Sequence, residues 1–335
     1  MSVTIKDIAK LAGTSRATVD RVIHNRGNVN KELEAKIKEI IKETNFTINE
    51  FGRGLVNLNK EYIIYLIINS IGNEFFETVL TAINNALKEY KNIKLVVDKL
   101  KGYKEEDQIK SIQKASNYEN LNLLLITPIN STSVADELNN IKIPIITINN
   151  DIEIERLAFI GCDYTNSGKI AGDLAKLILS DEGHVLIVAG SFKLFGHRQR
   201  VEGFQKVLNK HSKNYLFDII ENEDDDEISY KLVKSAIANK NYNLIYFCAG
   251  GISGGIKAVQ EINKDIKIIT VDETKAVIES LKNGLITATV TQQPIKQGTN
   301  AISIAVDYLI YGKKPAKILN YTSNDVKLKN SFFRE

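Results

Sequence analysis

The sequence contains no tryptophan, one methionine, two cysteines and four prolines in 335 residues. Cys162 and Cys248 lie far apart and form no disulfide framework or metal-ligand pattern, so we expect buried free thiols. No apolar run approaches the length that spans a bilayer, since the longest, around 62–68, has the length of a strand. The first residues lack a basic segment followed by an apolar one. This absence predicts no signal peptide and a cytoplasmic protein without membrane contact.

Motifs of catalysis are also missing from the sequence. It contains no GxSxG, HExxH, CxxC or Walker A pattern. The glycine-rich stretch AGGISGG at 249–255 follows a strand-like run but lacks the GxGxxG spacing of a dinucleotide site. Of the four histidines, only His197 is expected near a binding cleft, and none has metal-ligand spacing. We therefore expect no enzymatic activity, no metal and no cofactor.

Charge is unevenly distributed along the chain. Residues 1–60 hold 11 Lys and Arg against 7 Asp and Glu, whereas the whole chain holds 44 against 41. The positive excess thus lies entirely in the N-terminal sixth. Such a distribution is typical of a small nucleic-acid-binding domain attached to a neutral body.

The first 48 residues predict three short helices. Residues 5–12 carry apolar side chains at helical spacing, and Gly13 ends this helix as a left-handed cap. Ser15 then offers its hydroxyl as the N-cap of a second helix. In the second helix, the side chains expected to face inward are those of Ala17, Val19, Val22 and Ile23. A third helix begins after Asn30, and its apolar stripe contains Leu33, Ile37, Ile40 and Ile41.

Two helices joined by a tight turn indicate a helix-turn-helix domain, whose second helix enters the major groove of DNA. Arg16, at the start of that helix, has the donors to bind guanine O6 and N7. We expect Ser15, Thr18 and Asn25 to hold phosphates. The alternative from spacing alone is a three-helix cap with solvated charges.

The stretch TIKDIAKLAGTSRATVDRVIHNRGNVNKELEAKIKEIIKETNFTIN resembles the DNA-binding domain of the LacI family of bacterial repressors. The resemblance implies that Arg16, Ala17 and Arg21 read bases. Ala17 is a departure because it cannot form a hydrogen bond, and Asp20 is a second because a carboxylate near phosphates is unfavourable. Both departures leave the operator sequence open.

Residues 49–60 follow as a hinge. Asn49 can cap a short helix there, but Gly52 and Gly54 each cost it roughly 1 kcal/mol, so the segment orders only with a partner. The family resemblance implies that Leu55 wedges into the minor groove. A plain flexible linker is the alternative. The complete set of expected DNA contacts is Thr4, Ser15, Arg16, Ala17, Thr18, Arg21, Asn25, Asn49 and Leu55.

From residue 61 the pattern changes to short apolar runs that alternate with amphipathic stretches. Nine strands are expected at 62–68, 93–98, 121–127, 143–148, 156–161, 184–190, 244–250, 266–272 and 286–292. Continuous apolar strands separated by helices predict parallel sheets buried on both faces, and their number predicts two Rossmann-like α/β lobes. The acidic stretch at 221–227 is interpreted as a solvated loop and helix start.

Ligands of such sheets bind beyond the carboxyl ends of the strands. The polar and aromatic side chains expected there suit an uncharged, polyhydroxylated ligand. The candidate ligand-binding residues are Asn73, Phe75, Phe76, Asn149, Asn150, Arg198, Asp272 and Gln292. For any one of them the alternative is a helix cap, because Asn and Asp commonly follow strands in that role.

The body is similar to the periplasmic sugar-binding fold of LacI-family regulators, on the stretches NEFFETVLTAI, HRQRVEGF, TVDETK and TVTQQP. The resemblance implies that Arg198, Asp272 and Gln292 hold a sugar. Asn149 and Asn150 replace an Asp-Arg pair, and Ala249-Gly250-Gly251 replaces an Asn-Asp pair. These departures make ribose itself doubtful and favour a larger or differently substituted ligand.

Taken together, the sequence predicts a DNA-binding transcription regulator, a repressor by family default, whose operator affinity is controlled by a sugar, polyol or sugar phosphate. The expected assembly is a homodimer on a pseudopalindromic site in double-stranded DNA. A transport-type carbohydrate-binding protein and a sugar-modifying enzyme are the alternatives. The expected domains are a DNA-binding domain (1–48), a hinge (49–60), an N-terminal lobe (61–161 with 292–320) and a C-terminal lobe (162–291 with 321–335).

Overall fold

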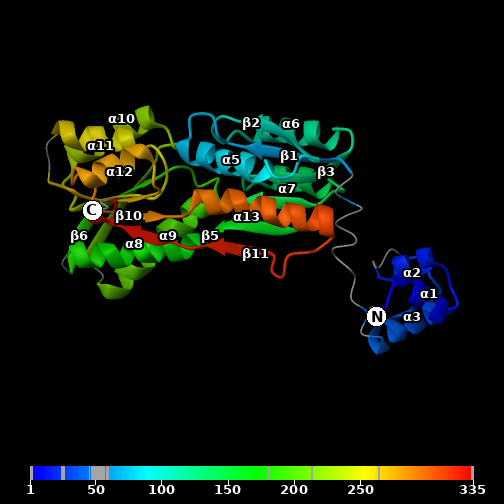
Figure 1. Cartoon of the computed structure of the whole chain (residues 1–335). Helices are drawn as coiled ribbons and strands as arrows, with labels where there is room; N and C mark the ends of the chain where they lie inside the picture. The colour runs from blue at the N-terminus through cyan, green and yellow to red at the C-terminus, as the bar shows by residue number, and fades with distance from the viewer. Residues whose placement is uncertain are drawn as a thin grey trace. The chain divides into compact units, whose positions relative to one another are not determined.

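The computed structural model describes residues 3–23, 27–44, 46, 57, 60–179, 181–212, 214–262 and 265–332. The chain divides into two compact units, 1–55 and 56–335. Both are drawn in Figure 1. Within the described part of the first unit, three helices are present: α1 (Ile5–Ala12), α2 (Arg16–Ile23) and α3 (Lys31–Glu43).

Side-chain caps fix where these three helices begin. The Thr4 hydroxyl accepts from the Asp7 backbone N–H, while the Asp7 carboxylate accepts from the Thr4 backbone, which completes a capping box for α1. Gly13 closes α1 at φ 71°, as its sequence position predicts. The Thr18 N–H donates to Ser15 Oγ at 3.1 Å at the start of α2. Asn30 caps α3 by accepting from the Glu32 N–H at 2.8 Å.

A small apolar core holds the three helices together. Its fully or nearly buried members are Ile8, Ala9, Ala12, Val19, Val22 and Ile37. Leu11, which has helical spacing with this set, is instead 57% exposed. Ala17, expected to face inward, is exposed as well. Both lie on the outer side of their helices, away from the core that this set forms.

The second unit contains two six-stranded sheets. The first, the N-terminal lobe, has the order β11-β5-β4-β3-β1-β2. Its strands are β1 (Tyr62–Ile68), β2 (Ile93–Lys99), β3 (Leu121–Ile126), β4 (Ile145–Ile148), β5 (Ala158–Cys162) and β11 (Leu319–Thr322). The second, the C-terminal lobe, has the order β12-β10-β9-β8-β6-β7. Its strands are β6 (Glu182–Ala189), β7 (Asn214–Glu221), β8 (Leu244–Phe247), β9 (Lys267–Val271), β10 (Ala288–Thr291) and β12 (Asp325–Lys327).

Helices cover both faces of each sheet, which explains the continuous apolar strands. In β1, Ile64 and Leu66 face one cluster while Tyr65 and Ile67 face the other. The first face packs α5 (Glu74–Leu87) and α13 (Pro294–Val306), and the second packs α6 (Glu105–Ser116) and α7 (Thr132–Asn139). In the C-terminal lobe, one face packs α8 (Tyr164–Ile178) and α9 (Phe195–His211), and the other packs α10 (Asp226–Asn239), α11 (Ile252–Ile262) and α12 (Lys275–Lys282). Figure 1 shows the groups α5–α7 and α10–α12 at opposite ends of this unit.

The chain passes between the two sheets at three places. β5 belongs to the first sheet and the following α8 packs on the second. After β10 the chain returns to the first sheet with α13, and between β11 and β12 it crosses once more. The strands expected from the sequence are present, but β7, β11 and β12 were not predicted. β7 is an edge strand of mixed polarity, whereas β11 and β12 are short and largely exposed.

A DNA-binding face and a ligand cleft

The helix-turn-helix unit presents most of the expected DNA-contacting residues to solvent. Ser15, Arg16, Ala17 and Arg21 are exposed and lie on or at the start of α2. The Thr4 hydroxyl and N–H both donate to the Asp7 carboxylate, so Thr4 has no spare donor for a phosphate. The expected contacts Asn25, Asn49 and Leu55 lie outside the described residues. The role of each residue on DNA stays a prediction.

A cavity of about 130 Å³ lies between the two lobes of the second unit. It is smaller than the roughly 300–1,000 Å³ of drug-sized pockets, so it fits a small ligand. Seven of the eight expected ligand-binding residues line it: Asn73, Phe75, Phe76, Asn149, Asn150, Asp272 and Gln292. They come from both lobes and from one of the crossings, as the rule for parallel strand ends predicts.

Arg198 requires a correction, because Arg200 takes the expected place on the cavity. Both lie on α9, but residues two positions apart on a helix are separated by about 200° around its axis. Their side chains therefore face nearly opposite ways. Arg198 is exposed and donates to the Phe192 carbonyl at 3.0 Å. Arg200 is 2% exposed. The sequence pattern HRQR contains both arginines, and the helical phase decides between them.

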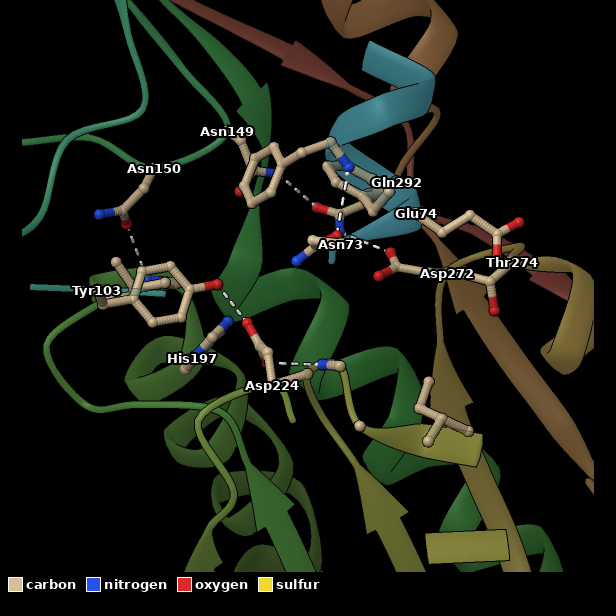
Figure 2. A pocket seen from close by; sticks show the side chains of 18 of the residues that line it. Asn73, Glu74, Tyr103, Asn149, Asn150, His197, Asp224, Asp272, Thr274 and Gln292 are labelled. Atoms are coloured by element: carbon tan, nitrogen blue, oxygen red, sulfur yellow. Dashed lines mark hydrogen bonds between the residues drawn. The ribbon is translucent and has the colours of Figure 1, made fainter. Parts of the chain in front are cut away.

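A hydrogen-bonded chain of side chains forms one side of the cavity (Figure 2). Gln292 Nε2 donates to Asp272 Oδ1 at 2.6 Å, and Asn149 Nδ2 donates to Gln292 Oε1 at 3.2 Å. Burial raises the pKa of the Asp272 carboxyl, although Arg200 and the hydrogen bond from Gln292 oppose that effect. Among the described residues no group donates to the second carboxylate oxygen of Asp272, which can accept from a ligand hydroxyl.

Arg200 is held rigidly beneath this chain. Its Nη1 donates to the Cys248 carbonyl at 2.9 Å, and its guanidinium carbon lies 4.7 Å from the centre of the Tyr164 ring. The Tyr164 hydroxyl in turn donates to the Asn149 carbonyl. Among the described residues Arg200 Nε has no hydrogen-bond partner, and it is buried away from the space of the cavity, so Arg200 shapes this side of the site rather than offering a free N–H to a ligand.

His197 supplies a further polar group. Its Nδ1 lies 2.9 Å from the Ser191 backbone nitrogen and 3.1 Å from the Ser191 carbonyl oxygen, so it accepts from the first or donates to the second. Burial lowers the pKa of His197, which favours the neutral ring. Nε2 of the neutral imidazole then has the opposite role to Nδ1, and a ligand hydroxyl suits either one.

Two of the expected residues also have structural roles. Asn150 Nδ2 donates to the Pro128 carbonyl and to Asn130 Oδ1, so both of its amide hydrogens are used within the protein. Asn73 caps α5 by accepting from the Phe76 N–H at 3.3 Å. Asn73 also lines the cavity, where Figure 2 labels it. The helix-cap alternative thus holds for Asn73 without excluding a ligand contact.

Hydrogen bonds cross directly from one lobe to the other around the cavity. The Tyr103 hydroxyl, in the loop after β2, donates to the Asp224 carboxylate, in the loop after β7 (Figure 2). The Lys275 N–H of α12 donates to Glu74 Oε1 of α5 at 3.0 Å. Burial raises the pKa of Tyr103 well above its ordinary value, so the phenol stays protonated as a donor. These contacts hold the cleft closed.

Sequence reasoning missed Tyr103, Tyr164, Asp224 and Glu74 on this cavity. Asp224 belongs to the acidic stretch that was interpreted as a solvated loop. Because β7 was not recognised as a strand, the position of that stretch at a strand's carboxyl end gave no signal. Tyr103 follows β2 at the same edge of its sheet and was detectable in principle by the strand-end rule.

Two other features are absent from the described residues. No group of three or more His, Cys, Asp or Glu is placed to hold a metal ion there. Within the same ranges, no helix has the length and apolar character needed to cross a membrane.

A two-lobed receptor for a small ligand, joined in sequence to a helix-turn-helix domain, is the class of protein that this fold and cleft define. Residues 64–314 match the periplasmic binding protein domain. Residues 4–49 match the bacterial regulatory proteins of the lacI family. The chain belongs to the LacI family of DNA-binding transcription regulators, and the expected fold is confirmed.

Relatives of known class agree with this assignment. The chain is 25% identical over 283 residues to the probable HTH-type transcriptional repressor ExuR of Bacillus subtilis (strain 168), covering 81% of this chain and 82% of that protein. It is 26% identical over 211 residues to catabolite control protein A of Staphylococcus aureus (strain Mu50 / ATCC 700699), and this match covers 63% of this chain and 62% of that protein.

Solved structures show the fold of the second unit. The glucose-galactose binding protein GanP of Geobacillus stearothermophilus superimposes with a TM-score of 0.75 at 21% identity, covering 82% of this chain and 99% of that one. A solute-binding protein of Bacillus halodurans C-125 with bound myo-inositol superimposes with a TM-score of 0.72 at 19% identity, covering 81% of this chain and 96% of that one.

Proposed function

We propose that this regulator binds an operator as a homodimer in the cytoplasm and changes its operator affinity when a small polyhydroxylated molecule occupies the cleft. The observation that carries the proposal is the cavity between the two lobes, lined by polar residues of both. Within it, the second carboxylate oxygen of Asp272 and Nε2 of neutral His197 are polar groups of the C-terminal lobe that a ligand can bind. Hydroxyl groups both donate and accept, so a sugar or polyol satisfies both.

Phe75 and Phe76 support a carbohydrate-like ligand. The two rings line the cavity and meet edge to face, with their centroids 5.4 Å apart. An apolar ring surface beside hydrogen-bonding groups matches the two faces of a sugar ring. The names of two structural relatives, a glucose-galactose binding protein and a solute-binding protein with bound myo-inositol, are consistent with this ligand class.

The closing contacts supply the coupling to DNA. A ligand that binds the closed form shifts the lobes towards closure in proportion to its differential affinity. Lobe closure then changes the operator affinity by a coupling free energy of about 1–3 kcal/mol in typical cases. We propose that ligand binding weakens operator binding.

A two-part experiment tests the proposal. A thermal-shift screen of pentoses, hexoses and polyols on the full chain identifies a ligand. Operators are selected from random double-stranded DNA, and fluorescence anisotropy then measures binding with and without that ligand. We expect the Asp272→Ala chain to bind the operator but to lose the ligand response. We expect the Arg16→Ala chain to lose operator binding but to keep the ligand-induced shift in melting temperature.

The proposal fails if no member of the screen changes either the melting temperature or operator binding. It also fails if Arg16→Ala binds the selected operator as tightly as the native chain. Product analysis after incubation with the screen's sugars separates a regulator from an enzyme, because a receptor returns its ligand unchanged.

A further inference from the structure

The charged groups around the cleft are mostly of one sign. Four carboxylate side chains line the cavity, namely those of Glu74, Asp224, Asp226 and Asp272. Arg200 is the one lysine or arginine among the lining residues that the structure describes. His197 is neutral there because burial lowers its pKa. The lining therefore carries an excess of negative charge in a nearly closed space.

Arg200 is poorly placed to offset a second anion. Nη1 donates to the Cys248 carbonyl at 2.9 Å, and Nη2 contacts Cys162 Sγ at 4.0 Å. One face of the guanidinium rests on Tyr164. Arginine binds a carboxylate or phosphate strongly when its fork makes two parallel hydrogen bonds. Here both prongs of the fork point at protein atoms.

One feature of the cleft that commonly binds anions, the N-terminus of α11, is already occupied. The glycine-rich stretch 249–255 leads into the N-terminus of α11, where backbone N–H groups commonly hold a phosphate. In this chain the Gly250 N–H donates to Asp224 Oδ1 at 2.8 Å, and the Gly254 N–H donates to Asp226 Oδ1 at 3.1 Å. The protein's own carboxylates thus take the positions of an anionic ligand.

We propose that the cleft selects an uncharged polyhydroxylated ligand and rejects its phosphorylated and carboxylated derivatives. This inference rests on the proposed function and narrows its ligand class. An added phosphate or carboxylate meets the four lining carboxylates and finds neither a free arginine fork nor a free N-terminus on α11. Like charges placed together at a binding site are a strong source of discrimination, so we expect at least about 100-fold weaker binding.

Matched sets of sugars provide the test on the full-length protein. The probes are glucose, glucuronate and glucose 6-phosphate; galactose, galacturonate and galactose 6-phosphate; and ribose with ribose 5-phosphate. Any neutral ligand from the wider screen is added with its acidic derivatives. Calorimetry measures each dissociation constant, and competition against the neutral parent measures the weak ones.

Each outcome decides the question. Binding of a neutral member, with its anionic derivatives at least about 100-fold weaker, supports the inference. An anionic derivative that binds as tightly as its neutral parent overturns the inference and leaves the proposed function intact. If no member of the sets or of the screen binds, the proposed function fails and this inference fails with it.

Adjacent aspartates offer a matched pair of variants. Asp226→Asn removes a lining charge and keeps an oxygen that accepts from the Gly254 N–H. Asp225→Asn removes a charge that does not line the cavity, and asparagine is an equally good N-cap for α10. We expect Asp226→Asn to improve the binding of the anionic derivatives by about tenfold, with a smaller effect for Asp225→Asn. Equal ratios in both variants and the native chain would overturn the electrostatic cause.

Discussion

Replacing Tyr103 by phenylalanine removes one oxygen atom and tests whether the Tyr103–Asp224 hydrogen bond controls ligand affinity. This bond joins the two lobes beside the cavity. The Tyr103 ring also packs edge to face against His197, with centroids 6.4 Å apart, and phenylalanine retains that contact. Asp224 retains its bond from the Gly250 N–H at 2.8 Å. The substitution therefore isolates a single contact.

The expected change in ligand affinity depends on which form of the protein, open or closed, loses the hydrogen bond. A hydrogen bond to a charged group contributes about 1.5–3 kcal/mol. When the lobes separate, water replaces the partner of each group, so the substitution destabilises the closed form and leaves the open form nearly unchanged. If the ligand binds the closed form and the free protein in solution is mainly open, the dissociation constant rises by the same factor, about 10- to 150-fold. We expect most of this change in the dissociation rate.

Calorimetry and stopped-flow measurements of the ligand found in the screen provide the assay. Tyr242→Phe is the matched control, because the Tyr242 hydroxyl donates to Asp218 at 2.6 Å within one lobe. That variant should lose stability to urea but keep its ligand affinity. An unchanged dissociation constant and dissociation rate in Tyr103→Phe would refute the reasoning. Non-additivity with Asp224→Asn would identify the pair as the source of the effect.

Three further predictions follow from the same site. Arg200→Lys should weaken ligand binding by about 10- to 150-fold in calorimetry, whereas Arg198→Lys, on the opposite face of α9, should leave it unchanged. Asp272→Asn should abolish ligand binding yet raise the free energy of unfolding at neutral pH, because burial raises the pKa of Asp272 and so its ionised form destabilises the fold. In urea titrations this gain in the free energy of unfolding should shrink as the pH falls through the raised pKa towards the ordinary value of 3.8. Below that value the Asp272 carboxyl is neutral in both the folded and the unfolded state. Gly168→Ala should destabilise the fold by about 1–3 kcal/mol in urea titrations and weaken ligand binding, since the added Cβ would lie 2.1 Å from the Arg200 carbonyl oxygen. Gly183→Ala is the control and should be tolerated, because its Cβ would lie 3.4 Å from the nearest atom.

The helix-turn-helix unit was predictable because its signals are local. A cap residue, a left-handed glycine and an apolar stripe each act within a few residues, and Ser15, Gly13 and Asn30 do in the structure what their positions predict. The apolar strands were predictable for the same reason, since burial on both faces leaves a continuous apolar run. β7 was not predicted because it is an edge strand, which pairs with a neighbouring strand on one side only and carries exposed residues such as Leu216.

The composition of the cleft was less predictable because it depends on contacts between lobes. The strand-end rule placed Asn73, Asp272 and Gln292 correctly on the cavity. It could not show that Tyr103 bonds to Asp224 across 121 residues of sequence. The choice between Arg198 and Arg200 needed the rotational phase of α9, which is set by its packing against α8 and is not visible in the residue types.

Backbone geometry shows why asparagine and aspartate recur at the turns beside the cleft. Asn149, Asp224 and Asp272 adopt φ values of 64°, 58° and 71°. This left-handed region is unfavourable for side chains with a Cβ, and asparagine and aspartate are among the residues that tolerate it best. The turn beyond each strand therefore requires a short polar residue before any ligand is considered. Such strained positions cost of order 1–3 kcal/mol each and persist where surrounding contacts hold them, as the bonds of Asn149 and Asp272 to Gln292 do. A residue type that the backbone demands thus also supplies the polar groups that face the cavity, which is why a turn signal in the sequence located the site without revealing its charge.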